Sequence, residues 1–367
     1  MPKSFENSVL ARQALNQGLL QSVRLVGEYR GKEALFKQQS PQVLQALRES
    51  ALIQSTESSN RIEGVVAPPQ RIRDLVAKRT QPANRSEQEI AGYRDVLNAV
   101  HTNFADMPLT SNLVLQLHRD LFQFVPGGGG RWKATDNDIT ETRPDGTKVV
   151  RFKPLAAHLT PDAMTRLHDA YREKLDAGTV EPLLLFSGYV LDFLCIHPFA
   201  DGNGRMARLL SLLLLYQAGY EVGRYISLEG VIEQMKEGYY DSLYASSQGW
   251  HEAQHSLLPW WEYFVGVVLV KAYRDFEDRV GVTSARRGAK RDMIRDAVNR
   301  LPNRFRYADL ERALPAISRP TIARALRQLR AEGAIRCLRP GRDAAWEKTE
   351  VQRVVDVIHS REDERRR

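Results

Sequence analysis

The sequence predicts a mainly helical protein with one β-hairpin and a separate basic unit at its C-terminal end. Most of the chain repeats apolar residues at helical spacing, and period-two alternation is confined to short stretches. Two such stretches flank Pro144, Asp145 and Gly146, which is typical of a hairpin turn. The charge is unevenly distributed. Residues 285–367 hold 22 Lys and Arg against 12 Asp and Glu, a net charge of +10, whereas the whole chain has a net charge of +8. This asymmetry indicates a different partner for the C-terminal segment.

Length and composition indicate a globular protein that does not span a membrane. With 367 residues and ordinary composition, the chain can form two or three globular domains. No apolar run reaches the length of a membrane span, and the first residues lack the apolar stretch of a signal peptide. We therefore expect a cytoplasmic protein with no membrane partner. The two cysteines, Cys195 and Cys337, have neither metal-ligand nor redox spacing.

Residues 1–105 are expected to form an N-terminal helical region. Helical spacing is weak over residues 7–28 and clearer from Pro41 to Ser55. Ser86 and Glu89 have the spacing of a capping box, which predicts that a helix begins there.

Residues 106–280 are expected to form a second, mainly helical domain. One helix is predicted from Thr110 to Phe124, ended by Pro126, and further helices follow one another from Pro161 onward. Residues 281–289 are polar, basic and contain glycine, as is typical of a linker.

The C-terminal unit, residues 290–350, is predicted to contain three short helices and then two strands, over 290–301, 307–314, 318–333, 335–338 and 344–348. This order resembles a winged helix-turn-helix, whose third helix would enter the major groove of DNA. The resemblance implies phosphate contacts by Arg319, Arg324 and Arg327. A winged helix that serves only protein contacts or a homodimer is the alternative. Residues 351–367 are expected to be a charged, disordered tail.

The densest cluster of reactive side chains lies at His197–Arg208, just before a Leu-rich run. A Gly-rich loop that opens a buried helix is an anion site, because N–H groups and the positive end of the helix dipole face outward. Arg205 and Arg208 share one face of the first turn. Asp201 is a hard oxygen ligand of the kind that Mg²⁺ takes, and His197 could accept a proton from an attacking hydroxyl. The segment predicts a phosphate site with its own base.

Residues 197–208 also resemble the core motif of Fic-domain proteins, His-Pro-Phe-x-Asp/Glu-Gly-Asn-Gly/Lys-Arg-x-x-Arg, and every fixed position matches. Similar enzymes transfer AMP from ATP to a hydroxyl side chain of a target protein and release pyrophosphate. The resemblance implies a Fic helical core with a β-hairpin flap, ATP as substrate and Mg²⁺ as cofactor.

The resemblance also assigns roles to single residues. His197 would be the general base that deprotonates a target Ser, Thr or Tyr, and Asp201 would hold Mg²⁺ against the α- and β-phosphates. Phe199 would anchor the loop in the core. The phosphates would lie against the start of the following helix, on Gly202, Asn203, Gly204, Arg205 and Arg208. The Asn203 side chain would donate as well, and Arg208 would hold the γ-phosphate.

Residues 136–153 carry the hairpin signal. In Fic proteins a β-hairpin flap lies over the active site and aligns the backbone of the target by strand addition. The resemblance therefore implies a target protein that docks its hydroxyl-bearing segment on this hairpin. A hairpin with only a structural role is the alternative.

Residues 55–64 contain the inhibitory pattern of the family, Ser/Thr-x-x-x-Glu-Gly/Asn, formed here by Ser59, Glu63 and Gly64. On a helix Ser59 and Glu63 share a face, and Gly64 would end that helix. In similar proteins the Glu pairs with the second motif arginine, here Arg208, and occupies the space that the γ-phosphate needs. A solvated Glu63 before a helix-ending glycine is the alternative.

Tyr240 and Tyr244 could wall an adenine pocket, as aromatic residues of this region do in relatives. Core packing of these tyrosines is an equally good interpretation. The sequence does not choose between the two.

His251, Glu252 and His255 fit the zinc-protease pattern His-Glu-x-x-His. On a helix both histidines would share a face and Glu252 could act as a base. Gly249 and Pro259 make a long rigid helix unfavourable here, so a zinc hydrolase is only a remote alternative.

Taken together, the sequence predicts an ATP-dependent protein adenylyltransferase that is held off by Glu63 against Arg208. A DNA-binding regulator that carries a Fic unit is a second hypothesis. A third is the reverse chemistry, because in some relatives the same Glu positions a water that removes AMP from the target. The sequence does not identify the target or the oligomeric state.

Overall fold

The computed structural model describes residues 3–39, 41–142, 146–285, 289–314, 318–339, 341 and 344–349. The chain divides into two compact units, residues 1–31 with 46–276 and residues 32–45 with 277–367. We call the first the helical unit and the second the C-terminal unit. Most of the predicted N-terminal region and of the predicted 106–280 domain thus belongs to one unit, whereas residues 32–45 and 277–280 belong to the other.

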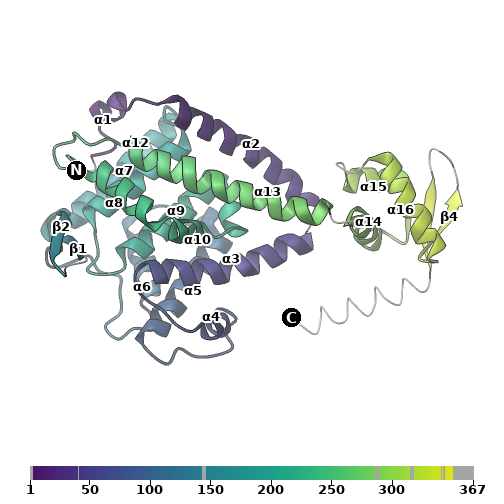
Figure 1. The fold of residues 1–367 in the computed structure, drawn as a ribbon, viewed down its shortest axis with the longest axis horizontal. Coiled ribbons are helices and arrows are strands. Elements are labelled where there is room, and N and C mark those ends of the chain that lie inside the picture. The colour runs from purple at the N-terminus through teal and green to yellow at the C-terminus, as the bar shows by residue number, and fades with distance from the viewer. Residues whose placement is uncertain are drawn as a thin grey trace. The chain divides into compact units, whose positions relative to one another are not determined.

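The helical unit is built mainly from helices (Figure 1). They are α1 (Asn7–Arg12), α2 (Gln17–Gln39), α3 (Pro41–Ile62), α4 (Pro69–Val76), α5 (Arg85–Asn103), α6 (Ser111–Leu121), α7 (Thr160–Ala177), α8 (Pro182–Ile196), α9 (Asn203–Gln217), α10 (Leu228–Gln234), α11 (Lys236–Ser247), α12 (Leu258–Trp261) and α13 (Val270–Ala285). Short 3-10 segments occur at Phe104–Asp106, Ala157–Leu159 and Val222–Arg224, and a π-helical segment, Glu262–Leu269, joins α12 to α13. No helix in the described ranges is long and apolar enough to cross a bilayer.

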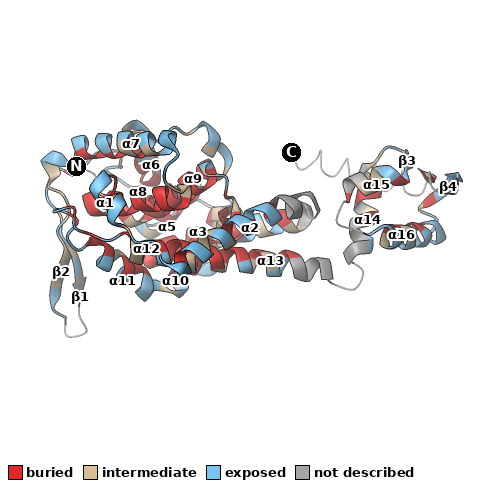
Figure 2. Ribbon diagram, turned by 90° about the horizontal axis from the view of Figure 1, so that it is seen from above, coloured by how far each residue is buried: buried red, intermediate tan, exposed pale blue. Residues whose placement is uncertain are grey.

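Helices α8 and α9 form the centre of the helical unit. Both are buried along nearly their whole length, as the red ribbons in Figure 2 show. Helix α8 is apolar on every side, and a helix of that kind is stable only inside a core. It packs against α7 on one side and α9 on another. The short loop between α8 and α9 is therefore held by two rigid, buried elements.

The predicted hairpin consists of β1 (Ile139–Thr142) and β2 (Lys148–Phe152), which pair antiparallel. The register pairs Thr142 with Lys148 and shifts by an irregularity next to Ile139. Gly146 has a φ of +83°, a left-handed conformation that suits glycine. Of the three predicted turn residues, Pro144 and Asp145 lie outside the described residues.

Several helix boundaries differ from those expected. Helix α2 continues through Gly31 to Gln39, because tertiary packing overrides the low helix propensity of glycine. The capping box at Ser86 was wrong: Asn84 caps α5, and its side chain accepts from the backbone N–H of Glu87. Helix α13 runs to Ala285, so the first half of the expected linker is helical.

The C-terminal unit contains α14 (Ala289–Arg300), β3 (Arg304–Arg306), α15 (Tyr307–Ala313), α16 (Arg319–Ala331), β4 (Ile335–Arg339) and β5 (Ala345–Lys348). The strands form an antiparallel sheet in the order β3-β5-β4, and β3 was not predicted. The core of this unit includes Ile294, Leu310, Ile322, Leu326, Leu329 and Trp346. The expected tail, residues 351–367, lies outside the described residues.

Desolvation lowers the pKa of several histidines of the helical unit, among them His101, His118 and His168. Burial lowers the pKa of His101 to about 3 and those of His118 and His168 to about 4. One carboxyl opposes this trend, since burial raises the pKa of Asp192 to about 6. The fold therefore carries more neutral histidines than an unfolded chain would at mildly acidic pH.

Stability is predicted to fall as the pH drops from about 6.5 towards 4. In that window the unfolded chain binds protons at His101, His118 and His168 that the native state excludes, which costs up to about 1.4 kcal/mol per pH unit for each histidine. Protonation of Asp192 favours the native state below about pH 6, but it offsets only one of the three. Urea unfolding followed by tryptophan fluorescence should give a lower midpoint at pH 5 than at pH 7. Equal urea midpoints at the two pH values would contradict the lowered pKa values of these histidines.

Candidate functional site

The candidate site is the loop between α8 and α9. His197 caps the C-terminus of α8 with a φ of +52°, and its backbone N–H donates to the carbonyl of Phe193 at 2.9 Å. Gly202, with a φ of +81°, caps the N-terminus of α9. A left-handed conformation is natural for Gly202 and strained for His197, so the surroundings must hold His197 in place.

Phe199 fixes the middle of the loop. Its side chain is fully buried and stacks on His118 of α6, with ring centroids 3.6 Å apart. His118 Nδ1 accepts from the backbone N–H of Gly130 at 2.8 Å, so its Nε2 carries the proton and donates to the carbonyl of Asp201 at 3.1 Å. His118 thus links the loop, at Asp201, to the backbone of Gly130, and its role was not predicted.

The Asn203 side chain closes the loop on itself. Its Oδ1 accepts from the backbone N–H of Phe199 at 2.9 Å, and its Nδ2 donates to the carbonyl of Phe199 at 2.7 Å. These contacts use Oδ1 and one of the two N–H donors of Nδ2, so the expected donation from this side chain to a phosphate stays a prediction that would use the second N–H. Asn203 also shapes the loop through its two bonds to the backbone of Phe199.

His197 has the properties of a neutral base. Its Nδ1 lies 3.3 Å from the carbonyl of Leu194, which can only accept, so Nδ1 carries the proton and Nε2 has a lone pair. Burial and the nearby ammonium of Lys133 lower the pKa of His197 to about 4. The imidazole is therefore unprotonated at neutral pH and can take a proton.

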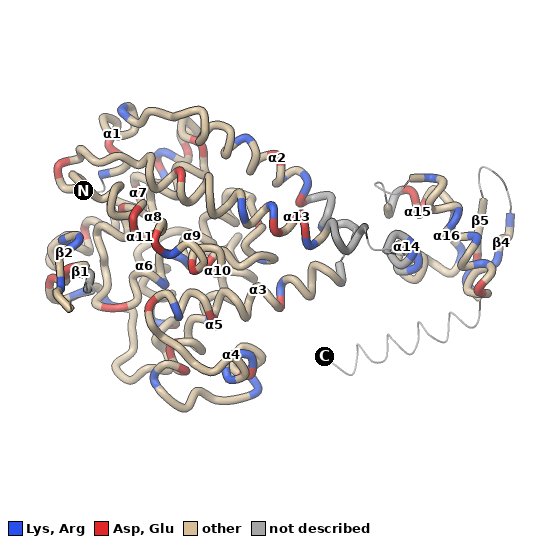
Figure 3. The backbone as a smooth tube through the Cα atoms, viewed as in Figure 1, with Lys and Arg blue, Asp and Glu red and all other residues tan. Residues whose placement is uncertain are grey.

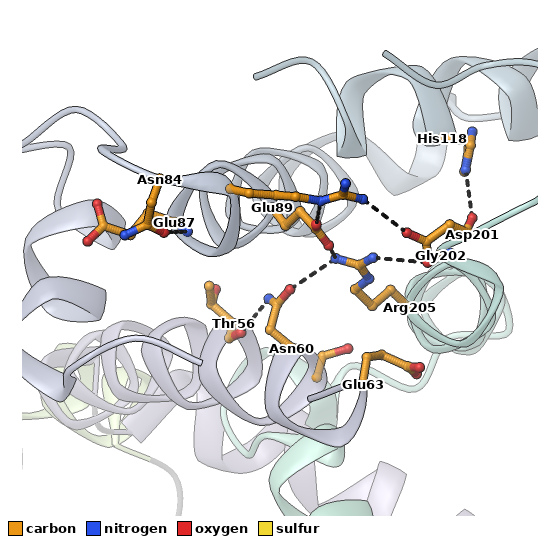
Figure 4. Close-up of polar contacts among 12 residues, drawn as sticks. Thr56, Asn60, Glu63, Asn84, Glu87, Glu89, His118, Asp201, Gly202 and Arg205 are labelled. Carbon is orange, nitrogen blue, oxygen red and sulfur yellow. Dashed lines mark hydrogen bonds and ion pairs between the residues drawn. The ribbon is translucent and has the colours of Figure 1, made fainter. Parts of the chain in front are cut away.

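Arg205 is a fixed, buried cation (Figure 4). Its Nη1 lies 2.6 Å from Glu89 Oε2 of α5, and its Nη2 lies 3.7 Å from Asp201 Oδ1. Arg85 bridges the same two carboxylates from the exposed side, at 2.9 Å from Glu89 and 3.8 Å from Asp201. Of the two carboxylates, Asp201 is well exposed, with 59% of its side chain accessible against 6% for Glu89, so Asp201 is the one that an incoming ion can reach.

Arg208, one turn further along α9, forms hydrogen bonds with two of the residues predicted to be inhibitory, Ser59 and Glu63. Its Nε donates to Ser59 Oγ at 2.8 Å, and its Nη2 donates to the Ser59 carbonyl at 2.9 Å and to Glu63 Oε1 at 2.8 Å. Nη1 of Arg208 is buried and has no hydrogen-bond partner among the described residues, and the same holds for Nε of Arg205. Buried guanidinium donors without a partner favour an anionic ligand.

The end of α3 places Glu63 at this position. Gly64 has a φ of +80°, and two backbone bonds close the helix: Gly64 N–H to the carbonyl of Arg61, and Val65 N–H to that of Asn60. This is the Schellman arrangement, which places Glu63 directly after Ile62, the last residue of α3. An added Cβ at Gly204 would come within 2.1 Å of Glu63 Oε1, so the carboxylate lies directly against the start of α9.

Electrostatics reinforce this contact. Burial by itself would raise the pKa of Glu63, but the guanidinium of Arg208 outweighs it and holds that pKa below its usual value. About two turns before Glu63, α3 is held by buried Glu229, which accepts from Ser55 Oγ at 2.7 Å and from Tyr93 OH at 2.9 Å. The carboxylate of Glu63 therefore occupies an anion position, held by a firmly anchored helix.

A cavity of about 710 Å³ opens beside the loop. It is lined by the hairpin, the end of α8, and α11, and His197, Gly204 and Glu63 face it. Tyr240 and Tyr244 line it with about two-fifths of their surface exposed, which argues against core packing for these two. The guanidinium of Arg151 on β2 lies 4.2 Å from the Tyr244 ring centre, so the hairpin and α11 meet at the cavity wall.

The zinc interpretation of His251 and His255 was wrong. These residues lie in turn and irregular backbone between α11 and α12, so they share no helical face. His251 Nε2 contacts the carbonyl of Lys153 at 2.8 Å, and His255 Nε2 contacts Ser4 Oγ at 3.0 Å. Within the described part of the chain, no group of three or more His, Cys, Asp or Glu residues could hold a metal ion.

Sequence reasoning missed Glu89 although a signal was present. Glu89 shares one face of α5 with the apolar residues Tyr93, Val96 and Val100, and a carboxylate on a buried stripe needs a buried cation. Nothing in the sequence identified Arg205 as that cation, because the contact spans more than a hundred residues.

Comparison with known proteins agrees with this geometry. Residues 108–215 match the model of the Fic/DOC family, so the chain contains a Fic/DOC domain. A curated relative, Protein adenylyltransferase Fic from Nematostella vectensis, is 26% identical over 186 residues, which are 48% of this chain and 40% of the relative. The chain thus matches less than half the length of that relative.

Solved structures share the fold. A Fic family protein from Desulfovibrio desulfuricans G20 superposes with a TM-score of 0.60 at 22% identity, covering 92% of this chain and 97% of that one. A Fic domain containing signaling protein from Bacteroides thetaiotaomicron VPI-5482 gives a TM-score of 0.57 at 20% identity, covering 71% of this chain and 98% of that one. The fold is therefore mainly helical and of the Fic type.

Replacing Glu89 by alanine should destabilise the helical unit by about 3 kcal/mol, because it leaves the buried Arg205 without its carboxylate. Arg85→Ala is the matched comparison: it removes the exposed partner of the same carboxylate and should leave stability almost unchanged. Urea unfolding measures both variants. Equal midpoint shifts for the two would contradict the buried role of Glu89.

Proposed function

We propose that this protein is an ATP-dependent protein adenylyltransferase whose resting state is blocked by Glu63. The observation that carries the proposal is the Glu63 carboxylate, which lies 2.8 Å from Arg208 Nη2 and against Gly204 at the start of α9. An anionic side chain there competes with an anionic phosphate for the same donors. The name of the curated relative supports the chemistry at the level of the family.

The transfer uses His197 as the general base. A hydroxyl oxygen of the target attacks the α-phosphorus of ATP while His197 Nε2 takes the hydroxyl proton. The new phosphoester bond attaches AMP to the target, and the bond between the α- and β-phosphates breaks to release pyrophosphate. The protein contributes positioning and charge neutralisation, with no covalent intermediate on the enzyme.

The start of α9 would bind the phosphates. The first N–H groups of a helix have no partner within it, so those of Asn203 and Gly204 could donate to a phosphate, and Arg205 adds a fixed positive charge. The N–H of Gly202 donates to Asp201 Oδ1 at 2.6 Å and would have to exchange that partner for a phosphate oxygen. Once Glu63 withdraws, Arg208 is free to hold the γ-phosphate. The exposed carboxylate of Asp201 beside this site fits a hard divalent cation, and Mg²⁺ bound there would neutralise phosphate charge.

The cavity and the hairpin would receive the two remaining parts of the substrates. The adenine base fits the aromatic wall formed by Tyr240 and Tyr244. The two-stranded hairpin β1–β2 offers a strand edge on which an extended target segment can add, with its hydroxyl near His197.

Glu63→Gly should raise label transfer from radioactive ATP to target or to the protein itself by about tenfold or more, since a competing contact of about 1.4 kcal/mol changes occupancy tenfold. His197→Ala in the same background should abolish transfer. Glu57→Gln, on the same helix but paired with Arg61, is the matched control and should behave as wild type.

Equal label transfer by wild type and Glu63→Gly would contradict the block. Absence of transfer by both would contradict the transferase assignment. The reverse chemistry predicts a different pattern: the wild type, but not Glu63→Gly, would release AMP from a previously modified target.

We propose DNA binding as a second function, carried by the C-terminal unit. Helices α14, α15 and α16 with strands β4 and β5 have the order of a winged helix-turn-helix. Arg324, Arg327 and Arg330 are exposed on α16, along the blue segments of Figure 3. Arg319 is less suited to phosphate contacts, because it pairs with Glu311 at 3.4 Å and lies over the Tyr307 ring.

Replacing both Arg324 and Arg327 by alanine should weaken duplex DNA binding by the full chain and reduce the salt dependence of log K by about 2. Arg304→Ala is the control, since Arg304 is neutralised by Glu347 at 2.9 Å. Gel-shift titrations at several salt concentrations measure both. Binding that is absent, or unchanged in the double variant, would contradict this function.

A further inference from the structure

Lys133 is a buried lysine next to the candidate base. Its side chain is only 5% exposed, and its ammonium donates to the carbonyl of Ile196 and to Asn137 Oδ1, both at 3.0 Å. Its backbone N–H donates to the carbonyl of Pro198 at 2.8 Å. Lys133 therefore binds the two carbonyls on either side of His197.

These contacts stabilise the backbone at the C-terminal end of α8 in two ways. The last carbonyls of α8 have no partner within the helix, and the negative end of its dipole favours a cation. His197 has a positive φ, which a non-glycine residue keeps only when its surroundings impose it. Asn137, which accepts a hydrogen bond from Lys133, holds a further part of the loop because its Nδ2 donates to the carbonyl of Phe199 at 3.1 Å.

The charge of Lys133 has a second effect. A positive charge beside an imidazole disfavours a second positive charge on it. Burial lowers the pKa of Lys133 to about 8, so the ammonium is still mostly charged at neutral pH. Other charged groups line the same cavity as His197 from α3, β2 and α11: Glu63, Arg151, Glu237 and Asp241. Of these, the carboxylate of Glu63 acts on His197 in the opposite sense to Lys133.

We propose that Lys133 is the positioning residue of the base: it holds the His197 backbone in its left-handed conformation, and its charge disfavours protonation of the imidazole. The first part concerns the structure alone. The consequence for catalysis rests on the proposed function, because only a general base needs a free lone pair on Nε2.

The direct test is an NMR titration of the histidine ring signals in the full-length protein, with the His197 signal assigned from its loss in His197→Ala. Lys133→Met should raise the titration midpoint of His197 by about one pH unit or more, since a charge within a few Å shifts a pKa by that amount. Lys133→Arg, which keeps the charge, should stay close to wild type. Lys271→Met removes a lysine paired on the surface with Asp275 and is the matched control.

An activity arm follows the pH dependence of label transfer in the Glu63→Gly background. Lys133→Met should move the acid limb to higher pH and lower kcat several-fold, with the KM for ATP nearly unchanged, and Lys133→Arg should restore most of both. If Lys133→Met does not fold, Lys133→Gln keeps a donor without the charge and carries the same comparison.

An unchanged His197 midpoint in Lys133→Met or Lys133→Gln would overturn the inference. A Glu63→Gly protein that transfers no label with Lys133 intact would contradict the proposed function instead, and the titration would still decide the role of Lys133.

Discussion

Two guanidinium groups are buried at the start of α9, and each needs an anion. Arg205 receives Glu89 of α5, whose side chain is 6% exposed, and Arg208 receives Glu63 of α3, whose side chain is 32% exposed. An unpaired buried charge costs several kcal/mol, so α3 and α5 must pack against α9 for the unit to be stable. This requirement explains why the N-terminal helices and the central helices form one compact body.

The two ion pairs differ in role: the pair of Glu89 with Arg205 is structural, and the proposed function gives the pair of Glu63 with Arg208 a regulatory role. Glu89 is enclosed and also held by Arg85, so its pair with Arg205 is permanent. Glu63 follows the C-terminal end of α3 and lies beside a cavity, while Arg208 also donates to Ser59. In the proposed function, withdrawal of Glu63 would leave Arg208 held by Ser59 and open to a phosphate in place of the carboxylate. The loop between α8 and α9 is held in one conformation by His118, Asn203 and Lys133.

Much of this arrangement could be predicted from local sequence. The Gly-rich segment before a Leu-rich run predicted a loop that opens a buried helix, and the spacing of Ser59 and Glu63 predicted that they share a face. The partners of Arg205 and His197 could not be predicted, because Glu89 and Lys133 lie far away in the chain and their contacts depend on packing. The bonds from the Asn203 side chain to the backbone of Phe199 could not be predicted for a related reason: the motif position of Asn203 does not show which atoms it contacts. Asn84 was missed because Ser86 offered an equally good cap by spacing alone.

The central claim is that Glu63 and the γ-phosphate of ATP compete for Arg208, and equilibrium binding tests it most directly. Calorimetric titration of wild type and Glu63→Gly with ATP and with ADP separates the γ-phosphate from the rest of the nucleotide. We expect Glu63→Gly to tighten ATP binding on the order of tenfold, equivalent to about 1.4 kcal/mol, and to change ADP binding much less. The same Kd for ATP in both proteins, or an equal gain for ATP and ADP, would contradict the account.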